Sequence, residues 1–159
     1  RWVSASLPVL MLRMKMCTPS WYVSRNRLES KEMTTVFDQK FLEKLLAEAT
    51  VSSRLRQNFD LRNGASDTSQ RMMNALQPGT EVPIHCHEDT AETVICLQGS
   101  LEEVIYEEAE GEFREVERHL LCPAEGLFGL QVPQGAWHKV IVHEPSIIFE
   151  AKDGAYVPR

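Results

Sequence analysis

The sequence predicts an all-β fold, an antiparallel barrel or sandwich of short strands preceded by one α-helix. Three observations lead to this prediction. A single amphipathic helical pattern occurs shortly after residue 34. From Gln70 onward, short apolar stretches of strand-like character follow one another. Turn pairs such as Pro-Gly, Gln-Gly and Glu-Gly separate these stretches, and no helical patterns alternate with them as they would in a parallel α/β sheet.

The composition fits one folded domain. The chain has 159 residues, of which 43% are hydrophobic, and a formal net charge of −6, which gives enough apolar material for one core. The negative charge argues against a nucleic-acid partner. The four cysteines show no CxxC or disulfide-framework spacing, so we expect reduced thiols and a cytoplasmic location. No apolar run approaches the roughly 18 residues of a membrane span.

Residues 1–33 differ from the rest of the chain. Residues 1–28 contain five of the 17 basic residues and no acidic one, whereas residues 29–159 hold 12 Lys+Arg against 23 Asp+Glu, a balance of −11. The first segment also has no sustained periodicity. We expect residues 1–33 to be an unstructured or non-native tail, with an organelle transit peptide as the alternative. Residues 34–159 are then one domain.

The helix is expected over residues 35–49, TVFDQKFLEKLLAEA, where aromatic and aliphatic residues recur at helical spacing. Asp38 is the expected N-cap, because a short acidic side chain accepts hydrogen bonds from the first turn. Residues 53–69 then predict a loop, with Asn63-Gly64 as a turn signal.

Eight short strands are expected after this loop. The acidic segment around LEEVIYEEAEGE predicts a solvated hairpin, and Glu150 and Lys152 on the last strand are expected to form an ion pair. In chain order, the expected strands are QRMMNAL, PIHCH, ETVICLQG, LEEVIYEE, EVERHLL, GLFGLQV, HKVIVHE and SIIFEAK.

The stretch HCHEDTAETVICLQG carries the candidate site. Side chains alternate along a strand, so His85 and His87 point to the same side. A hairpin around the EDTA turn would bring Glu92 to these imidazoles, and the turn in PQGAWH delivers His138 to the start of another strand. Imidazole nitrogens and a carboxylate oxygen are ligands that a borderline divalent metal takes. The four residues therefore predict a metal site.

These residues also resemble the cupin superfamily. Gly79, His85, His87, Glu92 and Gly99 match its first motif, G(X)5HXH(X)3–4E(X)6G, with every spacing in range. PQGAWH matches PXGXXH, the core of the second motif. The resemblance implies an antiparallel cupin, or jelly-roll, β-barrel with one N-terminal α-helix before it. It also implies that the two histidines of the first motif, its glutamate and the histidine of the second bind one divalent ion (Fe, Mn, Ni, Co or Zn).

Two positions depart from the second motif. Leu127 stands where the motif opens with glycine, and Val142 stands where it closes with asparagine. Both lie outside the implied ligand set, so only the loop geometry there is affected.

Roughly residues 36–158 further resemble small single-domain metal cupins of the WbuC type, found in bacterial surface-polysaccharide gene clusters. This resemblance implies a small polar or sugar-derived ligand and Lewis-acid chemistry. The alternatives are an Fe(II)-dependent dioxygenase and a non-catalytic binding or sensing cupin, and no side chain identifiable from the sequence is a clear general base. A homodimer is possible. Other candidate pocket residues are Cys96, which is alternatively a core residue, and Gln98, Arg71, Asn74 and Trp137.

Overall fold

The computed structural model describes residues 34–156 of the chain. The chain divides into two units, residues 1–35 and residues 36–159. All helices and strands described below belong to the second unit. The predicted tail, residues 1–33, lies outside the described residues.

The predicted helix is confirmed as α1, Gln39–Val51. Asp38 is its N-cap, as expected, and its side chain accepts a hydrogen bond from the backbone N–H of Phe41 at 2.8 Å. This contact satisfies one of the donors that the first turn of a helix leaves unpaired. One face of α1 buries Leu45 and Ala49. None of the helices in the described part of the chain has the length and apolarity that crossing a membrane requires.

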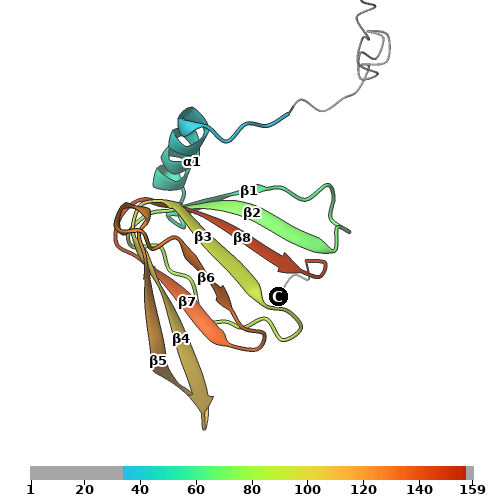
Figure 1. The fold of residues 1–159 in the computed structure, drawn as a ribbon, viewed down its shortest axis with the longest axis vertical. Coiled ribbons are helices and arrows are strands. Elements are labelled where there is room, and N and C mark those ends of the chain that lie inside the picture. Colours follow the sequence, from blue (N-terminus) through green and yellow to red (C-terminus); the bar gives the residue numbers. More distant parts are fainter. Residues whose placement is uncertain (1–33, 157–159) are drawn as a thin grey trace, which may run out of the picture. The chain divides into compact units, whose positions relative to one another are not determined.

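Two antiparallel sheets make up the rest of the unit (Figure 1). The larger sheet has the strand order β1-β2-β8-β3-β6, and the smaller has the order β5-β4-β7. The all-β prediction is therefore confirmed, with two sheets rather than one closed cylinder of hydrogen-bonded strands. The strands are β1 (Arg56–Asp60), β2 (Ser69–Leu76), β3 (Glu92–Gln98), β4 (Leu101–Ala109), β5 (Glu112–Leu121), β6 (Gly129–Val132), β7 (Trp137–Val142) and β8 (Ser146–Asp153), with a short 3-10 helix at Pro123–Glu125.

The larger sheet separates two apolar clusters. Its inner face and the smaller sheet enclose the first cluster, in which Ile148 of β8 packs with residues of β2, β3, β4 and β5. Its outer face packs against α1, and Ile147 of β8 belongs to this second cluster. Because successive side chains of a strand point to opposite faces, residues 148, 150 and 152 of β8 share the inner side. This alternation decides which polar residues can reach the site.

Residues 53–69 are not a continuous loop as predicted, because β1 lies within them. β1 is an edge strand that pairs only with β2, with Phe59 opposite Met73. Its sequence, RQNFD, lacks the β-branched residues that signal a strand. The partly buried ring of Phe59 packs beneath α1, so tertiary contacts stabilise a strand that local propensity does not predict.

The predicted strand at residues 83–87 is also absent. Only His85 makes an isolated bridge there, with His138. The predicted hairpin around the EDTA turn is therefore wrong, and β3 pairs with β6 and β8 instead. Pro83 lacks the backbone N–H that a ladder needs, which limits pairing in this segment.

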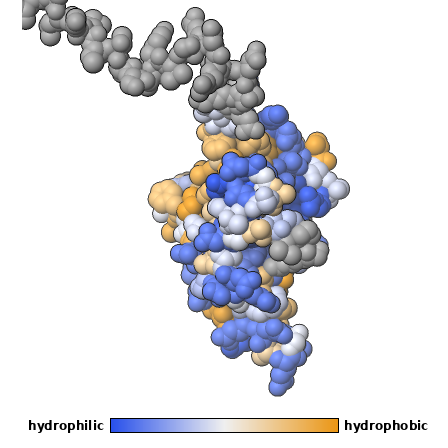
Figure 2. Space-filling view, turned by 90° about the vertical axis from the view of Figure 1, so that its right-hand side faces the viewer, coloured by the Kyte–Doolittle hydropathy of each residue, from blue (hydrophilic) through white to orange (hydrophobic). Residues whose placement is uncertain are grey.

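The predicted solvated hairpin β4–β5 is only partly solvated, because Leu101, Glu103 and Val104 at the start of β4 are buried and only the far end of β4 is exposed. Most of β5 is exposed, and its charged residues pair with neighbours on the surface, for example Arg114 with Glu107 at 2.9 Å. Figure 2 shows hydrophilic side chains covering the lower end of the molecule in that view, where this hairpin ends.

Candidate metal centre

Two backbone contacts join the segments that carry the histidines. The N–H of His85 donates to the carbonyl of His138 at 3.0 Å, and the N–H of His138 donates back to the carbonyl of His85 at 2.8 Å. The N–H of Gly135 also donates to the carbonyl of His87 at 2.8 Å. Gly135 has a φ of +74°, which a glycine adopts without steric cost. The PQGAWH turn is thus fixed directly to the HCH segment.

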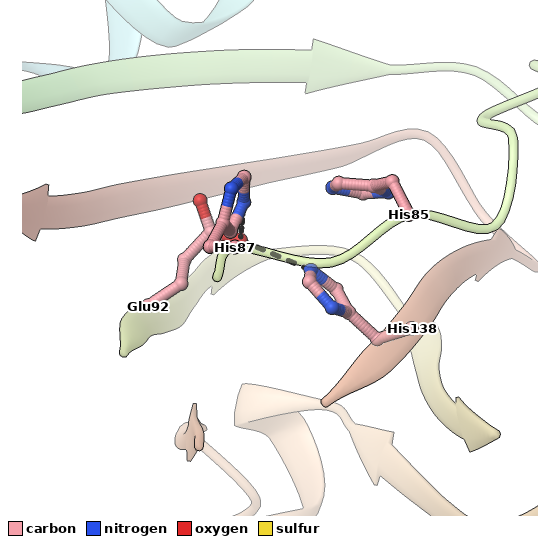
Figure 3. A group of neighbouring side chains, drawn as sticks. All are labelled: His85, His87, Glu92 and His138. Carbon is pink, nitrogen blue, oxygen red and sulfur yellow. Dashed lines mark hydrogen bonds and ion pairs between the residues drawn. The ribbon is translucent and has the colours of Figure 1, made fainter. Parts of the chain in front are cut away.

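The four predicted ligands lie together. One donor atom from each of His85, His87, Glu92 and His138 can be chosen so that all four lie within 4.8 Å of one another. Figure 3 shows the three imidazole rings and the carboxyl group gathered around a common space. The Oε2 atom of Glu92 lies 3.2 Å from Nε2 of His138 and 3.3 Å from Nε2 of His87. Glu92 and His138 are buried.

Backbone carbonyls orient two of the rings. Nδ1 of His85 lies 3.0 Å from the carbonyl oxygen of Pro83, and Nδ1 of His138 lies 2.9 Å from that of Ala136. A carbonyl oxygen only accepts hydrogen bonds, so Nδ1 carries the hydrogen in both rings. Nε2 is then the nitrogen that each ring presents to the cluster, an arrangement typical of metal-binding histidines.

A lysine occupies the edge of this cluster. Nζ of Lys152 lies 2.9 Å from Nε2 of His87 and 3.3 Å from Oε1 of Glu92. Among the ion pairs of the described residues, Lys152 pairs with Glu92 and not with Glu150. The predicted ion pair between Glu150 and Lys152 is therefore wrong. The contact also shows that a cation is already attracted to two of the four predicted ligands.

Burial and charge set the protonation of the cluster. Burial and the neighbouring His138 lower the pKa of His85 to about 4, so this ring is neutral near pH 7. Burial alone would raise the pKa of Glu92, but its contacts with His138, His87 and Lys152 outweigh burial and keep the carboxylate charged. Burial alone would lower the pKa of His138, yet the hydrogen bond to Glu92 raises it. A neutral imidazole and a charged carboxylate are the forms that bind metals.

The cluster opens into a cavity of about 350 Å³. This volume lies within the range of small-molecule sites. The cavity extends between the two sheets and mixes apolar walls, such as Met72 and Val94, with polar groups. Outside the four cluster residues, its polar and charged lining residues are Arg56, Gln70, Asn74, Glu103, Glu150, Lys152 and Tyr156.

Two further carboxyl groups face this cavity, and sequence reasoning missed both. Burial raises the pKa of Glu103 to about 7. Burial, followed by the charges of Glu92 and Glu103, raises the pKa of Glu150 to about 8. Asn74 donates a hydrogen bond to Glu150 at 2.7 Å. The sequence did contain one indication for Glu150. Side chains alternate along a strand, and Glu150 lies on the same side of the apolar last strand as the inward-facing Ile148.

The other pocket candidates are distributed differently. Of the five, only Asn74 lines the 350 Å³ cavity. Arg71 pairs with Asp67 at 2.8 Å, and Cys96 is buried in the apolar cluster, where its thiol donates to the carbonyl of Gln98. Trp137 lines an adjoining depression of about 650 Å³, which His87 and Lys152 also line.

Comparisons with known proteins agree with this architecture. A family model described as a domain of unknown function, DUF6016, matches residues 37–118. A search of curated proteins found no match. Among solved structures, the chain resembles the conserved protein SPY1581 of unknown function from Streptococcus pyogenes, with 16% identity and a TM-score of 0.54. That alignment covers 80% of this chain and 93% of SPY1581.

A second similar structure is the capsular polysaccharide assembling protein CapF from Staphylococcus aureus, with 14% identity and a TM-score of 0.53. The alignment covers 68% of this chain but only 30% of CapF. A third is the cupin domain of Schizosaccharomyces pombe Cnp3, with 13% identity, a TM-score of 0.43 and coverage of 62% of this chain and 64% of that one. At such identities, the likeness to SPY1581 and CapF concerns the fold alone.

Proposed function

The chain belongs to the DUF6016 family, whose model matches more than half of it, and we propose that it is a mononuclear divalent-metal cupin acting on a small polar or sugar-derived ligand. The observation that carries this proposal is the convergence of three imidazoles and one carboxylate at the end of a 350 Å³ cavity. The cluster would hold the ion, and the cavity would hold the ligand.

The donor set fits a borderline divalent ion such as Fe, Mn, Ni, Co or Zn. His85, His87 and His138 supply imidazole nitrogens, and Glu92 supplies a charged oxygen. An ion held by these four residues would supply Lewis-acid chemistry, by which a carbonyl or hydroxyl oxygen of the ligand would be polarised. The hydrogen bonds at Nδ1 of His85 and His138 support the arrangement, because they hold these rings in one orientation before an ion arrives.

The proposal includes a role in bacterial surface-polysaccharide metabolism, in the manner of WbuC-type cupins, and a cytoplasmic location. The polysaccharide role is supported by the sequence resemblance over residues 36–158. The name of the CapF neighbour mentions capsular polysaccharide assembly, but a likeness at 14% identity adds support for the fold only. The location is supported by the thiols of Cys96 and Cys122, which form no disulfide.

Metal analysis of untagged protein tests the proposal most directly. We expect close to one equivalent of a transition metal per chain after purification without a histidine tag. Iron would favour the dioxygenase alternative, whereas zinc, manganese, nickel or cobalt would favour Lewis-acid chemistry. A chain that copurifies with no metal, and binds neither Mn(II) nor Zn(II) in calorimetric titration, would contradict the proposal.

Glu92→Gln distinguishes a ligand from a nearby base. The change keeps the shape and removes the charge, so a ligand role predicts weaker binding of Mn(II) or Zn(II), with residual binding by the three imidazoles. An exposed glutamate on β4, Glu107, provides the control Glu107→Gln, which should bind like the parent. If Glu92→Gln binds metal as tightly as the parent, Glu92 is not a ligand.

A further inference from the structure

Among the residues that the structure describes, no hydrogen-bond partner contacts the buried carboxyl group of Glu103. It lies on β4 with an exposed fraction of 3%, and it lines the cavity next to the cluster. Within residues 34–156 its side chain makes no hydrogen bond and no ion pair. Burying a carboxyl group without a partner is costly, and most buried polar groups have one. This carboxyl group is thus available to a ligand in the cavity.

Glu150 lies at the same depth on the opposite sheet. On the larger sheet, Val94 pairs with Glu150 and Glu92 pairs with Lys152. On the smaller sheet, Glu103 pairs with Val140 and Ile105 pairs with His138. Glu150 and Glu103 therefore each lie two residues along the strands from the pairs that contain Glu92 and His138. Because side chains alternate, this distance is one inward-facing position from the metal cluster.

Asn74 holds Glu150 in place. The amide of Asn74 donates to Oε2 of Glu150 at 2.7 Å. Glu150 is thereby positioned by the protein, whereas Glu103 is left for the ligand. We call these two residues the carboxyl wall of the cavity.

The chemistry of this wall selects a ligand. Carboxyl groups accept hydrogen bonds from hydroxyl groups when charged, and they both donate and accept when protonated. An anionic group placed against two carboxyl groups would be repelled or would require both to be protonated. An apolar ligand would leave Glu103 unpaired. Hydroxyl groups satisfy the wall in either protonation state.

We propose that Glu103 and Glu150 bind hydroxyl groups of the ligand, and that this ligand is an uncharged polyhydroxylated compound lying between the carboxyl wall and the metal cluster. This inference rests on the proposed function of the cavity as a metal-dependent ligand site. It adds which residues recognise the ligand and which charge the ligand carries.

Matched sugars test the charge of the ligand. D-glucose and D-galactose are uncharged probes, and D-glucuronate and D-galacturonate differ from them by one carboxylate. We expect saturation-transfer NMR on the zinc-loaded full chain to detect the uncharged sugars at millimolar concentration, with at least 10-fold weaker binding of the acids. Tighter binding of the acids, or no binding of the uncharged sugars, would overturn the proposal.

Substitution of the wall tests the residues. Glu103→Gln keeps the shape but replaces the carboxyl group with an amide, and we expect about a 10- to 100-fold loss of affinity for the sugar that binds, the range for a hydrogen bond to a charged group. The control is Glu107→Gln on the same strand, which should bind like the parent. Circular dichroism and melting temperature verify that both variants fold. Unchanged sugar binding by both Glu103→Gln and Glu150→Gln would refute the assigned roles.

Metal titration separates this inference from the proposed function. Glu103→Gln should bind Zn(II) with the affinity of the parent, because Glu103 is not one of the four clustered residues. If the parent binds no metal, the proposed function fails, and the sugars are then tested on the metal-free chain. If the parent binds metal but only acids bind in the cavity, the carboxyl-wall inference alone fails.

Discussion

Lys152→Met should increase the affinity for a divalent metal. Nζ of Lys152 lies 2.9 Å from His87 and 3.3 Å from Glu92, and its side chain is only 13% exposed. Its ammonium group therefore occupies the position at which an ion would contact two of the four predicted ligands. Methionine has a similar length and no charge, so it removes this competitor without opening a large cavity.

The size of the effect follows from what a metal must displace. Two unit charges about 4 Å apart interact by about 4 kcal/mol at an effective dielectric constant of about 20, and a divalent ion doubles this figure to about 8 kcal/mol. That is an upper bound, because Lys152 also lines the adjoining depression of about 650 Å³ and can move into it. The remaining free-energy cost of metal binding is the loss of the contact between the Lys152 ammonium group and Glu92. A charge-assisted hydrogen bond of about 1.5–3 kcal/mol corresponds to about a 10- to 100-fold change in Kd.

Calorimetric titration of Zn(II) or Mn(II) into metal-free parent and variant measures this change. Lys44→Met is the control, because Lys44 on α1 is 77% exposed and lies outside the cluster. The metal-free Lys152→Met variant should also melt at a lower temperature, since Glu92 loses a neighbouring positive charge. Metal affinity that is unchanged or weaker in Lys152→Met would show that the ammonium group does not compete with the ion.

Three further predictions concern the ligands, the carboxyl wall and the fold. His138→Ala should lose high-affinity Zn(II) binding but keep the β-rich circular dichroism of the parent, because the apolar cluster between the sheets does not include His138; a disordered spectrum would contradict this. Metal-free parent protein should lose stability as the pH rises, because the folded-state pKa of Glu103, about 7, lies above the ordinary 4.5, so the stabilisation present below pH 4.5 is lost as the pH rises through 7. That difference corresponds to about 3 kcal/mol, and urea unfolding at pH 4.5 and pH 8 should show a correspondingly smaller loss in Glu103→Gln. Gly99→Ala should destabilise the fold by more than about 3 kcal/mol, because its φ is +90° and an added Cβ would collide with the Pro145 carbonyl and Ser146, whereas Gly111→Ala, with a φ of +83° and open space around it, should cost about 1 kcal/mol by the same unfolding measurement.

The grouping of the four clustered residues was predictable, but the pairing that produces it was not. The motif spacing and strand alternation place His85 and His87 on one side, and the structure does bring Glu92 and His138 to them. The expected hairpin, however, does not form, and the HCH segment is bridged to β7 instead. Long-range pairing depends on contacts between distant parts of the chain, which a local pattern does not contain.

The carboxyl wall was not predictable for a related reason. Glu102 and Glu103 are adjacent in an acidic segment, and local sequence does not distinguish them. In the structure, Glu102 pairs on the surface with Arg118 at 2.5 Å, whereas Glu103 faces the cavity. Which of two neighbouring glutamates is buried depends on the face that β4 presents to the opposite sheet. The charged residues of the last strand were misassigned in the same way, because Glu150 and Lys152 share the inner side but contact different partners.

The strand β8 contributes to both the apolar cluster between the sheets and the candidate metal centre. Along its inner side, Ile148 belongs to the apolar cluster, Glu150 to the carboxyl wall, and Lys152 to the edge of the metal cluster. Two residues advance a strand by about 6.6 Å. The apolar cluster, the carboxyl wall and the edge of the metal cluster are therefore each one inward-facing residue apart along β8. The neighbouring strand β3 of the same sheet follows the same order, since its pairs with these three residues are Cys96, Val94 and Glu92.

The packing of the core requires the observed register of β8. The positions of Glu150 and Lys152 in the site require the same register. A shift of β8 by one residue would turn Phe149 and Ala151 inward and place Glu150 against α1. The apolar cluster beneath α1, which contains Ile147 and is contacted by Phe149, opposes that shift, because it would expose the apolar side and bury a carboxyl group. The helix, although far from any predicted ligand along the sequence, therefore helps to fix the register that places the carboxyl wall next to the metal cluster.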